Sequence, residues 1–253
     1  MRLHLLSGGR LRMRRDVYYL DAAADETLEM PVVCGLIKHR QGVVLFDTGC
    51  HPDASVDAEA RWGAAAKYCE PIFEPASAVV GQLDVAGLSA GDVDVVVCSH
   101  LHFDHCGCNA FFPRATVICH ARELAAARAS DAVAMGYHRN DWDVGAPPVT
   151  IEGQHDVFGD GRVTLIPVPG HTPGSIAACV ALDRDGLFVL ASDAAPVSAC
   201  LARRYAPTNT VDVDDCLASI DEIARLAQAG ATVVCGHDDA QWRALRTGAA
   251  YYA

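Results

Sequence analysis

Four side chains of the types that bind metals fall within six residues of one another. The segment reads Ser-His-Leu-His-Phe-Asp-His from Ser99, and its candidate ligands are His100, His102, Asp104 and His105. Imidazole and carboxylate groups are the usual ligands of Zn²⁺ and neighbouring divalent metals. Buried polar groups must be paired, and this many have no obvious structural use in a core. The pattern therefore predicts a metal site rather than a set of structural histidines.

The spacing within this segment predicts two metals rather than one. His100 and His102 are two residues apart, so in an extended segment they face the same way. Asp104 and His105 follow where the chain turns, and they can aim at a second point. Two metals about 3.5–4 Å apart lower the pKa of a bound water from about 15.7 to about 7 and polarise a carbonyl oxygen. The predicted chemistry is hydrolysis of an ester, amide, thioester, lactone or phosphoester.

Three further candidate ligands each follow an apolar run that is expected to form a strand. They are His171, Asp193 and His237. The first metal is assigned to His100, His102 and His171. The second metal is assigned to Asp104, His105 and His237. Asp193 is expected to bridge both metals, because a carboxylate has two oxygens.

Asp47 is a candidate for orienting a metal ligand, and two cysteines are alternative candidates for binding the metal itself. Asp47 ends another apolar run, where it either orients a ligand by a hydrogen bond or forms an ordinary turn. Beside a metal site we favour the orienting role. Cys106 and Cys108 flank the histidines, but nitrogen and oxygen ligands already suffice. The eleven cysteines form no CxxC pair, so free buried thiols are expected.

The elements that must position these residues alternate between strands and helices. Apolar runs predict strands at residues 3–6, 17–20, 31–37, 43–46, 93–98, 115–119, 163–168, 176–182, 187–190 and 231–235. Helices are expected at residues 121–129, 211–229 and 240–246. Gly8 and Gly9 predict a turn, and residues 130–150 read as irregular and exposed. No linker separates the two halves, so residues 1–253 are expected to form a single α/β domain.

Aromatic residues in two loops are candidates for a substrate pocket. The loop at residues 51–75 carries Trp62, Tyr68 and Phe73, which either line a pocket for an apolar substrate or anchor the loop to the core. The segment 136–142 contributes Tyr137 and His138 as further candidates. Exposed aromatics at residues 60–75 and in the tail, Tyr251 and Tyr252, also suggest a homodimer.

The charge and the apolar content of the chain limit the kinds of partner it can bind. The formal net charge is −12, and the basic cluster at residues 10–15 reads as a solvated strand, so no nucleic-acid partner is expected. No apolar run approaches the roughly 18 residues of a membrane helix, and no signal peptide is visible. We therefore expect a soluble cytoplasmic protein without a membrane partner.

The order of these motifs resembles the metallo-β-lactamase superfamily. The resemblance is carried by the histidine-rich segment 100–105, Pro169-Gly170-His171, Asp193 and Gly236-His237-Asp238. It extends over nearly the whole chain. The N-acyl-homoserine lactone lactonases, which quench quorum sensing, are the most similar branch, through residues 46–49, 99–109 and 210–226. The segment 104–107 and the tail 246–252 are also similar to 4-pyridoxolactonase.

This resemblance implies an αβ/βα sandwich with a dinuclear site, most simply of two Zn²⁺ ions, at one edge. It implies a small lactone substrate whose carbonyl is attacked by a bridging hydroxide. Asp104 would pass a proton to the departing ring oxygen, and Phe103 would line the pocket. The leading substrates are N-acyl homoserine lactones. The alternatives are another small lactone such as 4-pyridoxolactone, or a thioester of the glyoxalase II kind.

One position departs from the lactonase pattern. These lactonases usually carry a tyrosine three residues after the bridging aspartate, where it assists the substrate carbonyl, but this chain has Pro196. Proline has no hydroxyl to donate. Either Tyr137, His138 or Tyr205 replaces that donor, or the substrate differs. A non-hydrolytic diiron flavoprotein is disfavoured, because those proteins have an acidic ligand in place of one histidine and an added flavin domain.

Overall fold

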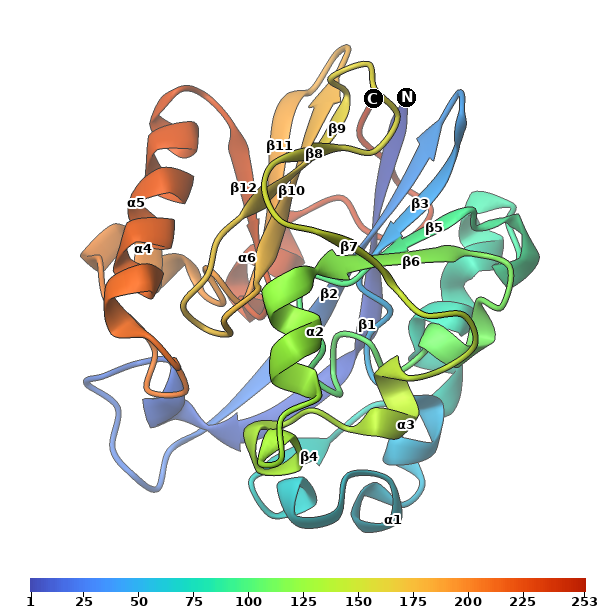
Figure 1. Cartoon of the computed structure of the whole chain (residues 1–253). Coiled ribbons are helices and arrows are strands. Elements are labelled where there is room, and N and C mark those ends of the chain that lie inside the picture. Colours follow the sequence, from blue (N-terminus) through green and yellow to red (C-terminus); the bar gives the residue numbers. More distant parts are fainter.

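Two β-sheets form the centre of the fold in the computed structural model, which describes residues 1–253 (Figure 1). The larger sheet has seven strands in the order β4-β1-β2-β3-β5-β6-β7. Their bounds are β1 Arg2–Arg14, β2 Thr27–His39, β3 Gly42–Phe46, β4 Cys69–Pro71, β5 Val95–Val97, β6 Thr116–His120 and β7 Val149–Ile151. The smaller sheet has five strands in the order β12-β11-β10-β9-β8. Their bounds are β8 His155–Asp156, β9 Val163–Pro167, β10 Ile176–Leu182, β11 Gly186–Ser192 and β12 Thr232–Cys235.

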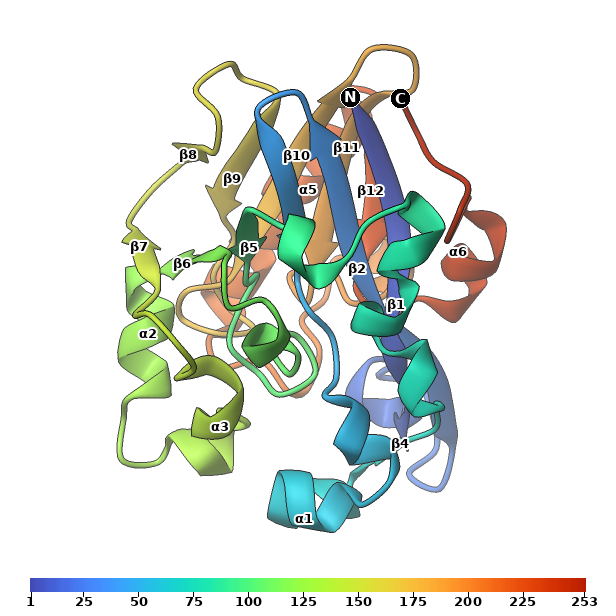
Figure 2. The same cartoon turned by 90° about the vertical axis from the view of Figure 1, so that its right-hand side faces the viewer.

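Helices lie on the outer faces of both sheets (Figures 1 and 2). Their bounds are α1 Ala58–Trp62, α2 Ala121–Ala127, α3 Arg139–Trp142, α4 Ser198–Arg203, α5 Val213–Gln228 and α6 Asp239–Ala244. Helix α5 packs Ile223 against Val189 of β11, outside the smaller sheet. Helices α2 and α3 pack Leu124 and Trp142 against the outer face of the larger sheet. The layers therefore form the αβ/βα sandwich that the resemblance to the metallo-β-lactamase superfamily implies.

Apolar side chains from both sheets meet between them. Phe46 and Val97 from the larger sheet pack in one cluster with Phe188 and Leu190 from the smaller sheet. Gly35 marks a close approach, because a Cβ there would lie 2.4 Å from a methyl group of Leu190. This buried layer supplies the rigid floor from which the strand ends project. Burying apolar area stabilises such a core by about 25 cal/mol per Å².

Helix α5 lies within the helix predicted at residues 211–229. The Asp212 side chain caps its first turn by accepting from the Asp215 N–H at 2.9 Å. Ile220 and Ile223 recur on one face and are buried. The Ser219 hydroxyl donates to the Pro169 carbonyl at 2.7 Å, so this helix also holds the loop that carries His171.

The amino-terminal prediction of two strands and a turn is wrong. One strand, β1, runs from Arg2 to Arg14 along β2, and its register shifts between Ser7 and Arg10. Gly9 has a φ of 113°, so the two glycines make a bulge instead of a turn. Of the residues predicted as a strand at 17–20, Val17 ends a 3-10 turn at Arg15–Val17, and residues 18–20 belong to no strand.

Residues 130–150 also differ from the prediction. They contain a 3-10 turn at Ala132–Met135 and helix α3, and Tyr137 and Trp142 are buried. Of the polar neighbours that suggested exposure, Arg139 and Asn140 are exposed, but Asp141 is buried.

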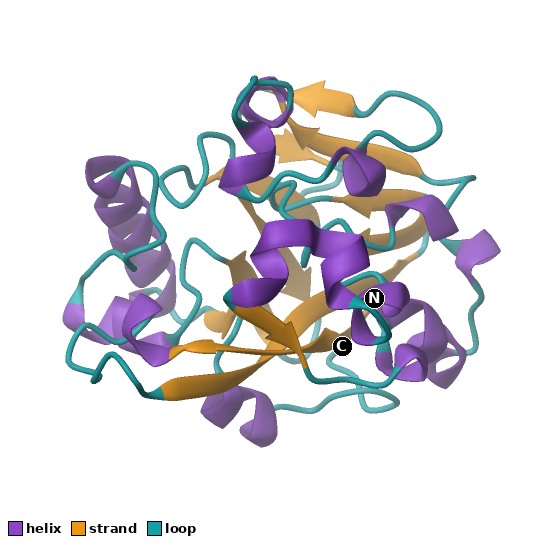
Figure 3. Ribbon diagram, turned by 90° about the horizontal axis from the view of Figure 1, so that it is seen from below, coloured by secondary structure: helices purple, strands orange, loops and turns teal.

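The two ends of the chain meet beside the sheets. Leu3 bonds to Tyr252 in both directions at 2.9 Å, and the termini lie together in Figure 1. Seen from below in Figure 3, helices and loops surround the strands. None of the helices combines the length and the apolar composition that a membrane crossing requires.

Candidate metal centre

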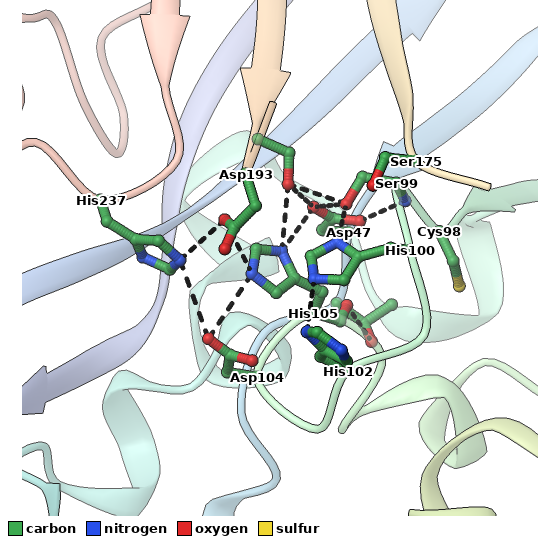
Figure 4. Close-up of polar contacts among 12 residues, drawn as sticks. Asp47, Cys98, Ser99, His100, His102, Asp104, His105, Ser175, Asp193 and His237 are labelled. Atoms are coloured by element: carbon green, nitrogen blue, oxygen red, sulfur yellow. Dashed lines mark hydrogen bonds and ion pairs between the residues drawn. The ribbon is translucent and has the colours of Figure 1, made fainter. Parts of the chain in front are cut away.

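The structure brings all seven predicted ligand side chains together at the ends of strands. Figure 4 shows His100, His102, Asp104, His105, Asp193 and His237 at this point. The segment from His100 to His105 follows β5, and His171 follows β9. Asp193 follows β11 and His237 follows β12. Strands of both sheets end at this edge, which is why residues far apart in the sequence converge.

Three histidines form the first group. Nδ1 of His102 lies 3.1 Å from Nε2 of His100 and 3.1 Å from Nε2 of His171. Nδ1 of His102 has a single lone pair, so it cannot accept well-aligned hydrogen bonds from both of the other nitrogens at once. Three imidazole nitrogens that converge on one point are the donor set of a divalent metal.

Asp104, His105 and His237 form the second group, and Asp193 lies between the two. Nε2 of His105 is 3.5 Å from Oδ2 of Asp104. Oδ1 of Asp193 lies 3.3 Å from Nε2 of His105, and Oδ2 lies 3.3 Å from Nε2 of His171. One carboxylate therefore presents a different oxygen to each group, as a bridging ligand would.

The donor set fits two divalent cations. Nε2 of His105, Nε2 of His237 and Oδ1 of Asp193 are buried and make no hydrogen bond. Leaving such atoms unpaired away from water costs about 1–3 kcal/mol each. Cations placed among them would satisfy all three atoms, and each group keeps its candidate ligand atoms within 4.8 Å of one another.

Burial sets the protonation of the first group. It lowers the pKa of His100, His102 and His171, and together with neighbouring groups brings that of His102 to about 3. These imidazoles are therefore neutral near pH 7, which is the form that binds a metal. Burial also lowers the pKa of His105, but the surrounding carboxylates raise it more, and the net shift is upward.

Hydrogen bonds outside the two groups fix how the rings point. Asp47 accepts from the Ser99 N–H at 2.6 Å and from Nδ1 of His105 at 2.9 Å. Nδ1 of His237 donates to the Pro31 carbonyl at 2.9 Å. Each bond directs Nε2 of its histidine into the site. Asp47 itself has a φ of 60°, a strained conformation for a residue with a side chain, and such strain is often stored at functional sites.

Known proteins are similar to this chain over most of its length. The model of the metallo-beta-lactamase superfamily matches residues 28–237. The chain belongs to that superfamily. N-acyl homoserine lactonase AttM of Azorhizobium caulinodans is 31% identical over 100% of this chain and 98% of its own length. AttM of Agrobacterium fabrum is 31% identical over 100% of this chain and 99% of its own length.

Solved structures agree with the fold. A quorum-quenching N-acyl homoserine lactone hydrolase superposes with a TM-score of 0.86 at 25% identity, covering 99% of this chain and 98% of that one. A Bacillus thuringiensis AiiA variant with N-decanoyl-L-homoserine at its active site superposes with a TM-score of 0.89 at 24% identity over the same shares. The superfamily member described here is thus a metal-dependent hydrolase with a site built for two divalent metals.

A pocket of about 400 Å³ opens onto the metal centre of this hydrolase. Its base includes His102, Asp104, His171 and Asp193. Its walls are largely apolar. The side chains of the walls include Met13, Tyr18, Met30, Tyr68, Phe103 and Met135. Phe103 and Tyr68 thus lie where the sequence places them, whereas the other predicted pocket residues do not.

Trp62 and Phe73 anchor their loop and do not line the pocket. Trp62 is 1% exposed and packs behind Phe103, with ring centres 4.6 Å apart. Phe73 packs near Gly9 at the bulge of β1. The anchoring alternative therefore holds for both, because the apolar core attracts large aromatic rings even from loops.

The predicted replacements for the missing tyrosine also point elsewhere. Tyr137 packs its ring 5.0 Å from that of His102, but its hydroxyl is buried outside the pocket. His138 packs edge-on to Phe103. The Tyr205 hydroxyl donates to the Tyr18 carbonyl at 2.6 Å. None of the three lines the pocket.

Tyr18 is the pocket residue that the sequence reasoning missed. Its ring is 2% exposed and stacks on the His237 ring at 5.8 Å. Its backbone is held by Tyr205, and that of Val17 by the Thr208 N–H at 3.0 Å. Burial, then the charges of Asp193 and Asp104, raise the pKa of its hydroxyl well above the ordinary value, so it stays a donor. No local motif marks this residue, because its partners come from the opposite end of the chain.

Proposed function

We propose that this hydrolase is a lactonase that opens the ring of N-acyl homoserine lactones, with two Zn²⁺ ions as its metals. The observation that carries the proposal is a pocket with four of the candidate metal ligands at its base and apolar side chains on its walls. A homoserine lactone ring fits the polar base, and its acyl chain fits the apolar walls. Full-length similarity to proteins named N-acyl homoserine lactonase supports the same substrate class.

The proposed ligands are the two groups described above. His100, His102 and His171 would hold one ion, and Asp104, His105 and His237 the other, with Asp193 between them. Such ions, when bound, supply hydroxide at neutral pH and polarise the lactone carbonyl. The imidazole-rich donor set with two carboxylates favours zinc over magnesium or calcium, which prefer oxygen ligands.

Asp104 is the proposed proton carrier. Burial raises the pKa of its carboxyl, but the facing imidazoles of His105 and His237 lower it more, to about 2. Near pH 7 the carboxylate is ionised and can accept a proton from the attacking water. It then gives that proton to the ring oxygen as the bond from the carbonyl carbon to that oxygen breaks. Water and lactone thereby become a hydroxy acid, with Phe103 packed beside the reacting ring.

Tyr18 is the proposed donor to the substrate carbonyl. Tyr18 lines the pocket, and its hydroxyl, whose pKa the charges of Asp193 and Asp104 raise further, keeps its proton at neutral pH. A hydrogen bond to the carbonyl oxygen would strengthen as negative charge develops on it. This assignment accounts for Pro196, because the hydroxyl comes from the amino-terminal segment and not from the loop after Asp193.

A substrate panel tests the proposed function. The panel contains N-hexanoyl and N-decanoyl homoserine lactones, 4-pyridoxolactone, simple γ- and δ-lactones, and S-lactoylglutathione, each with and without a chelator. We expect the two acyl homoserine lactones to give the highest kcat/KM, and the chelator to abolish it. A higher kcat/KM for S-lactoylglutathione, measured by thiol release, would identify a thioesterase. A higher value for 4-pyridoxolactone would identify a different lactonase.

A cytoplasmic location and a homodimer belong to the same proposal. Eleven free cysteines, ten of them buried, suit a reducing compartment. Of the aromatics that suggested a dimer, Trp62 and Tyr252 are buried, but Tyr68 stays exposed beside exposed Val133. Light scattering of the purified chain would test the dimer, and a monomer at micromolar concentration would contradict it.

A further inference from the structure

Glu123 is a buried carboxylate that joins the two loops carrying the three-histidine group. It lies in the first turn of α2 and is 0% exposed. One carboxylate oxygen accepts from the Leu101 N–H at 2.9 Å, and the other accepts from the Gly174 N–H at 3.0 Å. Leu101 lies between His100 and His102, and Gly174 lies three residues after His171. A single side chain thus holds both loops at once.

Burying the Glu123 carboxylate costs free energy, which a residue that only fills space would not require. Burial raises the pKa of its carboxyl. Neither Arg nor Lys pairs with it, and a buried carboxylate without a cation costs several kcal/mol unless hydrogen bonds compensate. Gly174 is also required here, because a Cβ would lie 2.3 Å from the Glu123 backbone nitrogen. The loop and the helix are therefore fitted closely to each other around this carboxylate.

The second ligand group has separate supports. Asp47 orients His105, and the Pro31 carbonyl orients His237. Glu123 contacts neither. Its two backbone hydrogen bonds reach the loops of His100, His102 and His171, whose ring nitrogens meet at 3.1 Å. The Thr172 and Tyr137 side chains also hydrogen-bond to it, so its contacts stay on this side of the site. The two metal positions are therefore held by different parts of the structure.

We propose that Glu123 is a positioning residue that sets the spacing of the three-histidine group and thereby the zinc affinity of that position alone. The inference rests on the ligand groups of the proposed function, but not on which substrate the enzyme hydrolyses. Removing one of its two bonds lets the loop of His171 move relative to the loop of His100 and His102. Outer hydrogen bonds of this kind change metal affinity by about 10–100-fold.

The test uses two variants, each of which keeps only one complete ligand group, so that zinc binding at each position is measured separately. His237→Ala leaves the three-histidine group as the only complete one, and His102→Ala leaves only the other. Glu123→Gln is then added to each, because its amide keeps the shape but can accept only one of the two N–H bonds. Zn²⁺ affinity is measured by competition with a chromophoric chelator. We expect at least about tenfold weaker binding in the His237→Ala background and less than about threefold in the His102→Ala background.

A matched control is Asp156→Asn. The Asp156 carboxylate also accepts backbone N–H bonds, from Gly159 at 2.9 Å and Gly161 at 2.6 Å, but in the loop before β9. It should leave zinc binding unchanged in both backgrounds. Equal weakening by Glu123→Gln in both backgrounds would reduce Glu123 to a general structural role and overturn the inference. Unchanged affinity in both would overturn it too.

A second variant covers the case in which Glu123→Gln does not fold. Glu123→Asp keeps the charge but is one methylene shorter, so it cannot reach both N–H groups, and the same site-selective loss is expected. Because the readout is zinc affinity, this pattern can hold even if the substrate panel rejects homoserine lactones. A wild-type chain that binds no zinc would contradict the inference and the ligand assignment together.

Discussion

Oδ1 of Asp193 lies 2.9 Å from Nε2 of His237, with neither atom engaged in a hydrogen bond. Two buried acceptor atoms at this separation repel one another unless a cation or a proton lies between them. The other oxygen of the same carboxylate faces His171 at 3.3 Å. We therefore expect both metal positions to depend on Asp193.

Asp193→Ala should deplete both metals and abolish turnover. Metal content per chain should fall from about two equivalents towards zero, because the bridging oxygens are lost to both positions. Turnover should fall by a factor of about 1,000 or more, equivalent to about 4 kcal/mol in activation free energy. Elemental analysis and lactone hydrolysis measure the two effects. Full metal content with normal turnover would remove Asp193 from the bridge.

Asp47→Asn should weaken the metal held by His105 while leaving the fold intact. The amide has nearly the shape of the carboxylate, but it keeps only one acceptor oxygen, so it cannot accept from both the Ser99 N–H and Nδ1 of His105. His105 would then lose its fixed tautomer, and zinc affinity should fall by about 10–100-fold. Zinc competition titration checks this. If Asp47 serves only as a turn residue, thermal stability will change while zinc affinity does not.

Tyr18→Phe should slow catalysis without removing metal. Loss of one hydrogen-bond donor to a developing oxyanion lowers kcat by about 10–1,000-fold. The phenylalanine ring keeps the stacking on His237, so zinc content should stay at the wild-type value. Steady-state kinetics with elemental analysis measures both.

Tyr137→Phe is the matched control for Tyr18. It also removes a phenol hydroxyl beside the metal centre, but one that does not line the pocket. Its kcat should stay within about threefold of wild type, as expected for a group outside the reacting atoms. Equal losses in the two variants would show that Tyr18 has no special place at the carbonyl.

The sequence predicted the metal centre far better than the pocket. Ligand residue types carry their chemistry with them, and each candidate ligand followed an apolar strand, so His171, Asp193 and His237 could be placed at one edge. Helix α5 was predictable because its apolar positions and its Asp212 cap are local.

The pocket was less predictable because exposure and direction depend on distant contacts. Trp62 falls in a segment predicted as a loop, yet it is the last residue of helix α1 and packs behind Phe103. Tyr18 reads as part of a strand, yet the loop of Tyr205 and Thr208 holds it against His237. Gly8 and Gly9 read as a turn because glycine favours both turns and bulges, and only the pairing of β1 with β2 decides between them.

The central claim is that lactone opening depends on two metals held by these seven side chains. The direct test is to remove metal from the wild-type chain with a chelator, add back Zn²⁺ in fractions of an equivalent, and follow the acid released from N-hexanoyl homoserine lactone. We predict no activity in the metal-free chain and a maximum at two equivalents per chain. Ring opening at the full rate by the metal-free chain would contradict the claim.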